Sequence, residues 1–147
     1  MLTTDSTAKY FLLTKATQAV RKLVSYYNSE LSPLGITAPQ MIALGVLCFQ
    51  EDLSLGEFAF QMKIRKATAV SMIKRLEALG LVTKEPHPRD ARLNVLKITE
   101  KTRELIPKIH AKVAELESMI EHQVGASSLE RIVKDLSMLL EVEFENK

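Results

Sequence analysis

The sequence predicts a mostly α-helical fold with one small β-hairpin, which is an α+β class. Apolar residues recur every three or four positions through most of the 147 residues, a spacing typical of amphipathic helices. Between residues 81 and 98 that spacing gives way to two short strand-like runs, and the loop between them holds Pro86 and Pro88. Helix, tight turn, basic helix, strand, loop and strand follow one another from Ser54 to Thr99. That order is the order of a winged helix-turn-helix.

Two helices are expected before this segment. The first begins after the N-capping residues Asp5–Thr7 and ends near Gly35. The second spans about Ala38 to Phe49, behind a capping box formed by Thr37 and Gln40. Its residues are apolar nearly all round, so we expect it to be buried.

The next two helices form the predicted helix-turn-helix. A capping box at Ser54–Glu57 starts a short helix that runs to about Met62. The following helix runs from Arg65 to Leu79 and stops at Gly80, where a left-handed C-terminal cap is expected. The apolar stripe expected to face the core on this helix is Ala67, Val70, Ile73 and Leu76.

The hairpin is predicted to be a wing with a long basic tip. Leu81–Lys84 is the first strand and Leu93–Ile98 the second. The loop between them is Glu85–Arg92, because its prolines remove backbone donors and interrupt a strand.

Two further helices are expected after the wing. The first starts at Thr99 and Glu100 and ends at Gly125, and its apolar residues are spaced almost as in a coiled-coil seam. These residues are Leu105, Ile109, Val113, Leu116 and Ile120. The second begins with a cap at Ser127–Glu130. Its apolar face is Ile132, Val133, Leu136, Leu139, Leu140 and Phe144.

Residues 1–147 are expected to form a single domain, in which 36–102 are the winged unit and 1–34 and 103–147 are dimerisation helices. The flanking helices carry more apolar surface than a unit of roughly 60 residues covers by itself. Pairing with a second copy of the chain, a homodimer, is therefore favoured. The alternative is a monomeric bundle in which the helices fold back.

The charge is unevenly distributed along the chain. Residues 62–103 hold eleven cationic and four acidic residues, a net charge of +7. The remainder holds nine cationic and fourteen acidic residues, a net charge of −5, so the overall +2 conceals a basic middle. Such a segment attracts polyanions, which makes double-stranded DNA the expected partner.

Other classes of function find little support. The sequence contains no nucleophile elbow, no glycine-rich phosphate loop and no metal-ligand spacing, so we expect no enzyme, no cofactor and no metal site. The longest apolar run, Met41–Phe49, is far shorter than the roughly 20 residues of a membrane helix. With no signal peptide and one cysteine, a cytoplasmic location is expected. Cys48 is expected to be a buried, inert thiol, with redox sensing as the alternative.

Several of these motifs together resemble the MarR family of bacterial winged helix-turn-helix transcription regulators. They are Ile36–Gln40, Ser54–Ala59, Ile64–Glu77 with the Leu79–Val82 turn, and the wing motif Pro88–Arg92 followed by Ile98–Lys101. The resemblance implies a homodimer with interlocked terminal helices that binds a pseudo-palindromic operator, usually as a repressor. It also implies release by a small phenolic or other anionic effector, or by cysteine oxidation.

The chain departs from the family pattern at two places. Thr102 stands where the family usually has glycine after the second strand. Ala69–Ser71 stand where threonine or serine followed by arginine is common, so no base preference is carried over.

The expected DNA contacts come from the helix-turn-helix and the wing. They are Ser54, Arg65, Lys66, Thr68, Ala69, Met72, Arg75, Arg89 and Arg92. Arg65 and Lys66 are equally suited to bases or phosphates, and Ala69 and Met72 to thymine methyls. The wing arginines suit a narrow minor groove. Asp90 is expected to orient an arginine through a salt bridge, with a turn cap as the alternative.

Two questions stay open from the sequence. A winged-helix module that binds protein and not DNA is the alternative to a regulator. No ligand site is assigned: Tyr10, Arg21, Tyr26 and Tyr27 suit a phenolate, but core or surface positions are favoured for them.

Overall fold

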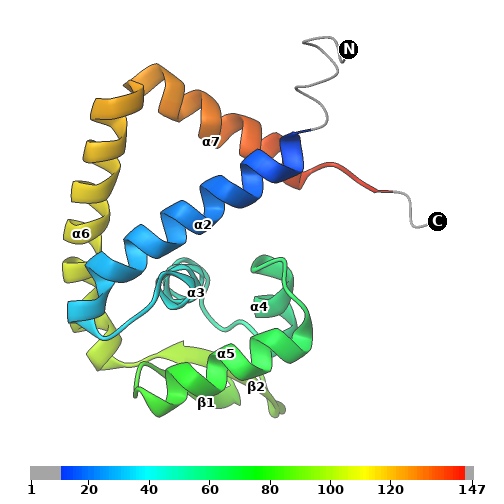
Figure 1. The fold of residues 1–147 in the computed structure, drawn as a ribbon. Helices are drawn as coiled ribbons and strands as arrows, with labels where there is room; N and C mark the ends of the chain where they lie inside the picture. The colour runs from blue at the N-terminus through cyan, green and yellow to red at the C-terminus, as the bar shows by residue number, and fades with distance from the viewer. Residues whose placement is uncertain (1–10, 145–147) are drawn as a thin grey trace. The chain divides into compact units, whose positions relative to one another are not determined.

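The computed structural model describes residues 11–144 as helices and one antiparallel hairpin (Figure 1). The elements are α2 (Leu12–Leu31), the 3-10 turn η1 (Ser32–Leu34), α3 (Ala38–Phe49), α4 (Leu55–Gln61), α5 (Lys66–Ala78), β1 (Val82–His87), β2 (Asp90–Ile98), α6 (Glu100–Val124) and α7 (Ala126–Leu140). The chain divides into two compact units, one ending at Ile109 and one starting at His110. The expected winged unit, 36–102, lies within the first. The predicted mostly helical fold with a hairpin wing is confirmed.

The core of the first unit forms around α3. Figure 1 shows α3 surrounded by α2, α4, α5 and the hairpin, and α3 contacts α2, α4 and β2 directly. The largest side chains with almost no exposed surface include Leu44 of α3, Phe58 of α4 and Ile73 of α5. Burial of side chains of this size is the main favourable term in folding, at about 1.5–3 kcal/mol each.

Local capping starts α3 and α4 where the sequence predicts. The Thr37 hydroxyl accepts from Gln40 N at 3.4 Å, and Gln40 Oε1 accepts from Thr37 N at 2.9 Å. At α4 the Ser54 hydroxyl accepts from Glu57 N at 3.2 Å, and Glu57 Oε2 accepts from Ser54 N at 2.7 Å. Both capping boxes are confirmed. The N-caps expected at residues 5–7 lie outside the described residues.

Helix α5 is rotated relative to the expectation. Its buried residues are Ala69, Ile73 and Leu76, each with no exposed surface. Ala67, expected in the core, is exposed, and Val70 is half-buried. Ile73 and Leu76 are buried as predicted, whereas the N-terminal part of the stripe was wrong, because Ala69 and not Ala67 is buried there. Both stripes fit a helical period, because one proceeds from Ala69 by steps of four and three residues and the other from Ala67 by steps of three. Only packing against the neighbouring helices decides which stripe is buried.

The hairpin is longer and its turn shorter than predicted. Strand β1 continues through Pro86, which lies opposite Asn94, and only residues 88 and 89 separate the strands. Each strand of a two-stranded sheet has an outer edge, so a proline can continue a strand with its missing donor directed outward. The register shifts beside His87, so that Ala91, Arg92 and Leu93 bulge from β2. The predicted eight-residue loop was wrong.

The second unit holds most of α6 and all of α7. α7 begins directly after Gly125, whose φ of +86° ends α6 as expected. Ser127 lies inside α7 and no side chain caps the helix, so the predicted cap at Ser127–Glu130 was wrong. The helix ends at Leu140. Phe144, expected on its apolar face, lies beyond it and is 82% exposed.

By length and hydropathy, no single helix within residues 11–144 passes as a membrane span. The α2–η1 segment and α3 pass the test jointly, with a bend of 75° between them.

Two glycines offer a matched test of backbone conformation. Gly80 has φ +70°, and an added Cβ would meet nothing closer than Lys101 Cδ at 3.9 Å. Gly80→Ala should therefore lower the free energy of unfolding by about 1–2 kcal/mol through left-handed strain alone. Gly45→Ala, in the interior of α3 with open space at the Cβ, should instead raise it by about 0.5–1 kcal/mol. Urea unfolding of both variants measures the difference, and equal effects would contradict the assigned cap.

Candidate nucleic-acid interface

Helix α5 presents a polar, cationic face to solvent. Arg65, Lys66, Thr68 and Arg75 are exposed, as the sequence predicts. Arg65 is the N-cap residue, so its side chain leaves from the start of the helix.

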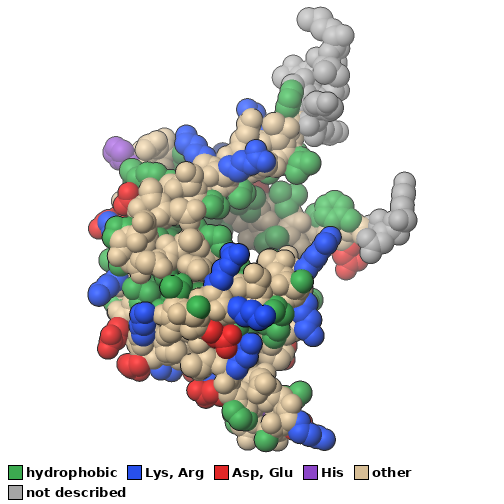
Figure 2. All heavy atoms as spheres, turned by 60° about the horizontal axis from the view of Figure 1, so that its bottom comes forward, with side chains coloured by type: hydrophobic (Ala, Val, Ile, Leu, Met, Phe, Trp, Pro, Cys, Tyr) green, Lys and Arg blue, Asp and Glu red, His purple; other side chains and the backbone are tan. Residues whose placement is uncertain are grey.

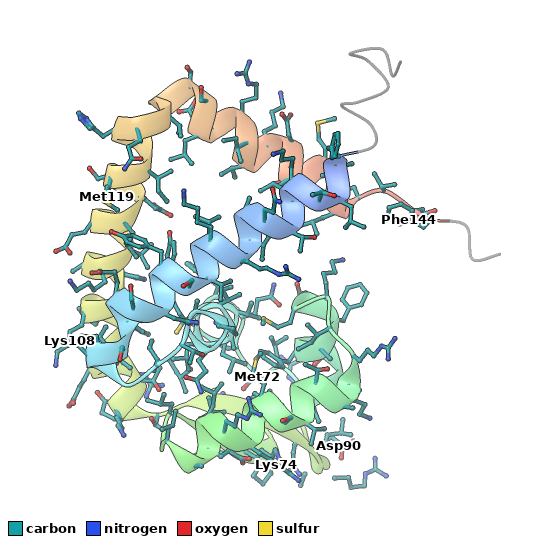
Figure 3. All side chains as sticks on the ribbon, viewed as in Figure 1. Met72, Lys74, Asp90, Lys108, Met119 and Phe144 are labelled. Atoms are coloured by element: carbon teal, nitrogen blue, oxygen red, sulfur yellow. The ribbon has the colours of Figure 1, made fainter. Side chains whose placement is uncertain are left out.

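Two of the expected contact residues lie elsewhere on α5. Ala69 has no exposed surface, so a thymine methyl cannot reach it, and it belongs to the core and not to the contact set. Met72 is half-buried. Figure 3 places Met72 on the side of α5 that is toward α3, whereas Lys74 lies on the outer side. The two apolar side chains expected at base edges therefore help to fix α5 in place.

The outward face contains three residues that the sequence prediction did not include. Ala67, Ser71 and Lys74 are exposed, and they lie opposite the buried stripe because successive helical residues turn by about 100°. Centring the helical wheel on Ala69, Ile73 and Leu76 would have found them.

Ion pairing separates the cationic side chains into two groups. Lys84 lies 3.5 Å from Glu77, Arg92 pairs with Asp90, and Lys97 pairs with Asp52. Among the described residues, no ion pair involves the side chains of Arg65, Lys66, Lys74, Arg75 or Arg89, all of which are exposed. Figure 2, which brings the bottom of Figure 1 forward, shows Lys and Arg side chains across this face. A polyanion would meet these unpaired charges first.

At the wing, Asp90 holds Arg92 in a defined orientation. Arg92 Nε and Nη2 donate to the two oxygens of Asp90 at 3.0 and 3.2 Å, and Arg92 N donates to Oδ1 at 3.1 Å. Both expectations for Asp90, the arginine salt bridge and the turn cap, are present at once. These bonds, the side-chain one first, hold the pKa of the Asp90 carboxyl below its usual range. The Arg92 side chain remains 90% exposed and so available.

The tip of the wing is a two-residue turn closed by His87. The Arg89 backbone N–H donates to His87 Nδ1 at 3.0 Å, which fixes the backbone from which the exposed Arg89 side chain projects. His87 therefore has a structural contact within the turn.

The base of the wing is tied to the turn between α3 and α4. Leu96 N donates to Leu53 O at 2.8 Å, and Lys97 pairs with Asp52, whose backbone has φ +60°. The hydrogen bond to Asp52 raises the pKa of Lys97. These two links make the wing and the helix-turn-helix one block.

Ser54 has a capping role that limits its use as a contact. Its hydroxyl accepts from Glu57 N, and its backbone N–H bond to the Glu57 carboxylate lowers the pKa of Glu57. The Ser54 hydroxyl can still donate its proton in a hydrogen bond to a phosphate.

The remaining candidates do not form a reactive site. Cys48 is half-buried, and burial raises the pKa of its thiol, which disfavours the thiolate. Residues 11–144 hold no group of three or more His, Cys, Asp or Glu suited to a metal ion. An open cleft of about 290 Å³ lies between the η1 turn and the start of α6, and neither Tyr26 nor Tyr27 lines it, while Tyr10 lies outside the described residues. Its lining residues are Leu34, Gly35, Ile36, Leu79, Leu81, Lys101, Glu104, Leu105 and Lys108.

The order of elements, the exposed cationic α5 and the hairpin define a winged helix-turn-helix protein. Residues 34–93 match the model of the MarR family. The match covers 60 of the 147 residues and includes α3, α4, α5, β1 and the start of β2.

The similarity to individual proteins is moderate in sequence and extensive in fold. The organic hydroperoxide resistance transcriptional regulator of Bacillus subtilis (strain 168) is 32% identical over 80 residues, which are 54% of this chain and 54% of that protein. The chain thus matches about half the length of this relative. Among solved structures, the transcriptional repressor CouR bound to a 23-mer DNA duplex has a TM-score of 0.83 at 21% identity, over 91% of this chain and 95% of CouR. The MepR–DNA complex of S. aureus has a TM-score of 0.74 at 18% identity, over 89% of this chain and 96% of MepR.

The Asp90–Arg92 pair can be tested without DNA. In Arg92→Ala the pKa of Asp90 should rise toward the ordinary value of 3.8, because the side-chain bond is lost while the backbone bond remains. Since the pair lowers the pKa in the folded state, its contribution to stability is present above pH 3.8 and is lost as the pH falls through the lowered pKa. Carboxyl ¹³C chemical shifts against pH report the value. Arg89→Ala is the control, and an unchanged Asp90 pKa in Arg92→Ala would refute the pairing.

Proposed function

We propose that the protein is a sequence-specific DNA-binding transcriptional regulator that acts as a homodimer on a pseudo-palindromic operator. It occupies its operator as a repressor in the cytoplasm, and a small anionic or phenolic effector releases it. The observation that carries the proposal is the set of exposed, unpaired cationic side chains on α5 and at the wing tip. Fixed acidic partners have not neutralised these charges, so DNA phosphates can do so and release counterions.

The outward face of α5 supplies the chemistry for base contacts. Arg75 and Lys74 suit guanine O6 and N7, Thr68 and Ser71 can donate to or accept from either base of a pair, and the Ala67 methyl suits thymine. Arg65 and Lys66, at the start of the helix, serve bases or phosphates. The CouR and MepR structures, which contain DNA, support docking of a fold of this kind on a duplex.

In the wing, Arg89 and Arg92 are proposed to enter the neighbouring minor groove. A narrow minor groove has an enhanced negative potential that attracts arginine. Asp90 would be repelled by phosphates, so its role is to keep the Arg92 guanidinium in position. The ordering entropy of that side chain is then lost during folding and not during binding.

Homodimer formation is supported by the apolar face of α7. Its side chains are 43–64% exposed in the single chain, although all are large and apolar. They are Ile132, Val133, Leu136, Leu139 and Leu140. A second copy of the chain is the proposed cover, since such an isologous contact buries the same face twice.

The wing arginines provide the first test. Arg89→Ala and Arg92→Ala should each weaken binding to any duplex by roughly tenfold, because hydrogen bonds to charged groups contribute about 1.5–3 kcal/mol. Each should also reduce the slope of log K against log salt by about one. Fluorescence anisotropy with labelled duplex over a salt series measures both quantities.

Arg131→Ala, which removes an exposed charge from α7, is the matched control and should change neither quantity. Unchanged affinity and slope in the wing variants would refute the wing assignment. If the unaltered protein binds no duplex even at low salt, the result contradicts the regulator and favours the protein-interaction alternative. Selection from a random DNA pool gives the operator and its symmetry.

The dimer has a separate test. Leu136→Arg should raise the dimer dissociation constant by roughly a hundredfold or more, since a symmetric interface loses two buried leucines at about 1.5–3 kcal/mol each. Sedimentation equilibrium measures the association, and circular dichroism verifies the fold. Lys134→Glu, a polar substitution on the same helix, should leave the dimer intact. A monomeric unaltered protein would contradict the proposal.

A further inference from the structure

Three consecutive carbonyls at the C-terminal end of α5 are bonded by side chains from the start of α6. Lys101 Nζ donates to Leu79 O at 2.7 Å, Thr99 Oγ1 donates to Gly80 O at 2.7 Å, and Thr102 Oγ1 donates to Leu81 O at 2.6 Å. Figure 1 shows the two helix ends side by side. These three carbonyls belong to the C-cap and the turn that directly follows α5, whose amides bond back to Arg75 O, Glu77 O and Leu76 O. The start of α6 thus holds the turn that ends α5.

The three bonds differ in their surroundings. Thr102 has no exposed surface and is a buried polar residue of the core, whereas Lys101 is exposed and lines the open cleft. Water can replace a lost Lys101 bond, but it cannot easily replace the buried Thr102 bond. The Thr102 hydroxyl is therefore the part of this contact that holds a single geometry.

The backbone of Thr102 also takes part in this contact, through Thr99. Thr102 N donates to Thr99 Oγ1 at 3.3 Å, which orients that hydroxyl while it donates to Gly80 O. Leu81 O accepts from both Thr102 Oγ1 and Thr99 N, the latter at 3.1 Å. Loss of the Thr102 hydroxyl thus leaves Leu81 O with one bond and does not orphan it. A valine variant should therefore fold with a looser end of α5.

We propose that Thr102 is a positioning residue for DNA recognition, which holds the C-terminal end of α5 against the first turn of α6 so that the outward face of α5 has one orientation. Glycine, which the MarR pattern has at this place, would supply no such bond. Base contacts need a fixed orientation, whereas phosphate contacts made by long flexible side chains tolerate variation. The Thr102 bond therefore affects the affinity for operator and not the affinity for duplex in general. This inference rests on the proposed function.

The test compares Thr102→Val, which keeps the shape and removes the hydroxyl, with Thr102→Ser, which keeps the hydroxyl. With the operator from random-pool selection, Thr102→Val should lower the ratio of operator to non-operator affinity by about fivefold, as expected for one hydrogen bond. Thr102→Ser should restore the ratio to that of the unaltered protein. The slope with salt should not change in either variant. Ile109→Val, a buried change on α6, controls for a general loss of stability and should leave the ratio unchanged.

Amide hydrogen exchange without DNA separates this inference from the proposed function. The amides of Leu79, Gly80 and Leu81, which bond back into α5, should exchange faster in Thr102→Val and at the original rate in Thr102→Ser. Unchanged exchange in Thr102→Val overturns the positioning role. This outcome does not depend on whether the protein binds DNA. Faster exchange with an unchanged affinity ratio overturns the role in recognition. If Thr102→Val does not fold, Thr102→Ala, which removes the same hydroxyl without a branched side chain, should make the same amides exchange faster. No change in exchange in that variant overturns the proposal.

Discussion

The burial of Ala69, Ile73 and Leu76 is the constraint on which the rest of the first unit depends. Each has no exposed surface, so α5 cannot rotate about its axis without removing one of them from the core. A helix turns by about 100° per residue, and this burial therefore determines that Ala67, Ser71, Lys74 and Arg75 face outward. The chemistry offered to a partner is thus a consequence of core packing.

The same block includes the wing. Its strands pair closely up to a two-residue turn, and its base is bound to the turn before α4 through Leu53–Leu96 and Asp52–Lys97. A hairpin of two strands is only marginally stable in isolation. These contacts supply the tertiary support that keeps Arg89 and Arg92 at a fixed distance from α5.

The cationic side chains of the basic segment fall into two groups, those with a bonding partner in the described part of the chain and those without one. Lys84, Lys97 and Lys101 use their ammonium groups within the protein, on Glu77, Asp52 and Leu79 O. The exposed side chains of Arg65, Lys66, Lys74, Arg75 and Arg89 have no acidic partner within residues 11–144. Arg92 combines both properties, because it pairs with Asp90 and remains 90% exposed. A net charge calculated from sequence cannot distinguish these groups, because pairing depends on residues that are distant along the chain.

Features that depend on residues close together in the chain could be predicted from the sequence. The capping boxes at Thr37 and Ser54 and the left-handed glycines Gly80 and Gly125 were predictable, since each involves contacts within about four residues. The MarR resemblance was also carried by local motifs and is confirmed. Tertiary structure alone decided the rotation of α5, the extension of β1 through Pro86 and the bond from Thr102 to Leu81. All three features depend on long-range contacts: the packing of α5 on its partners, the pairing of β1 with β2, and the bond between residues 21 positions apart. A periodic sequence pattern is compatible with several such packings, so it cannot show which one forms.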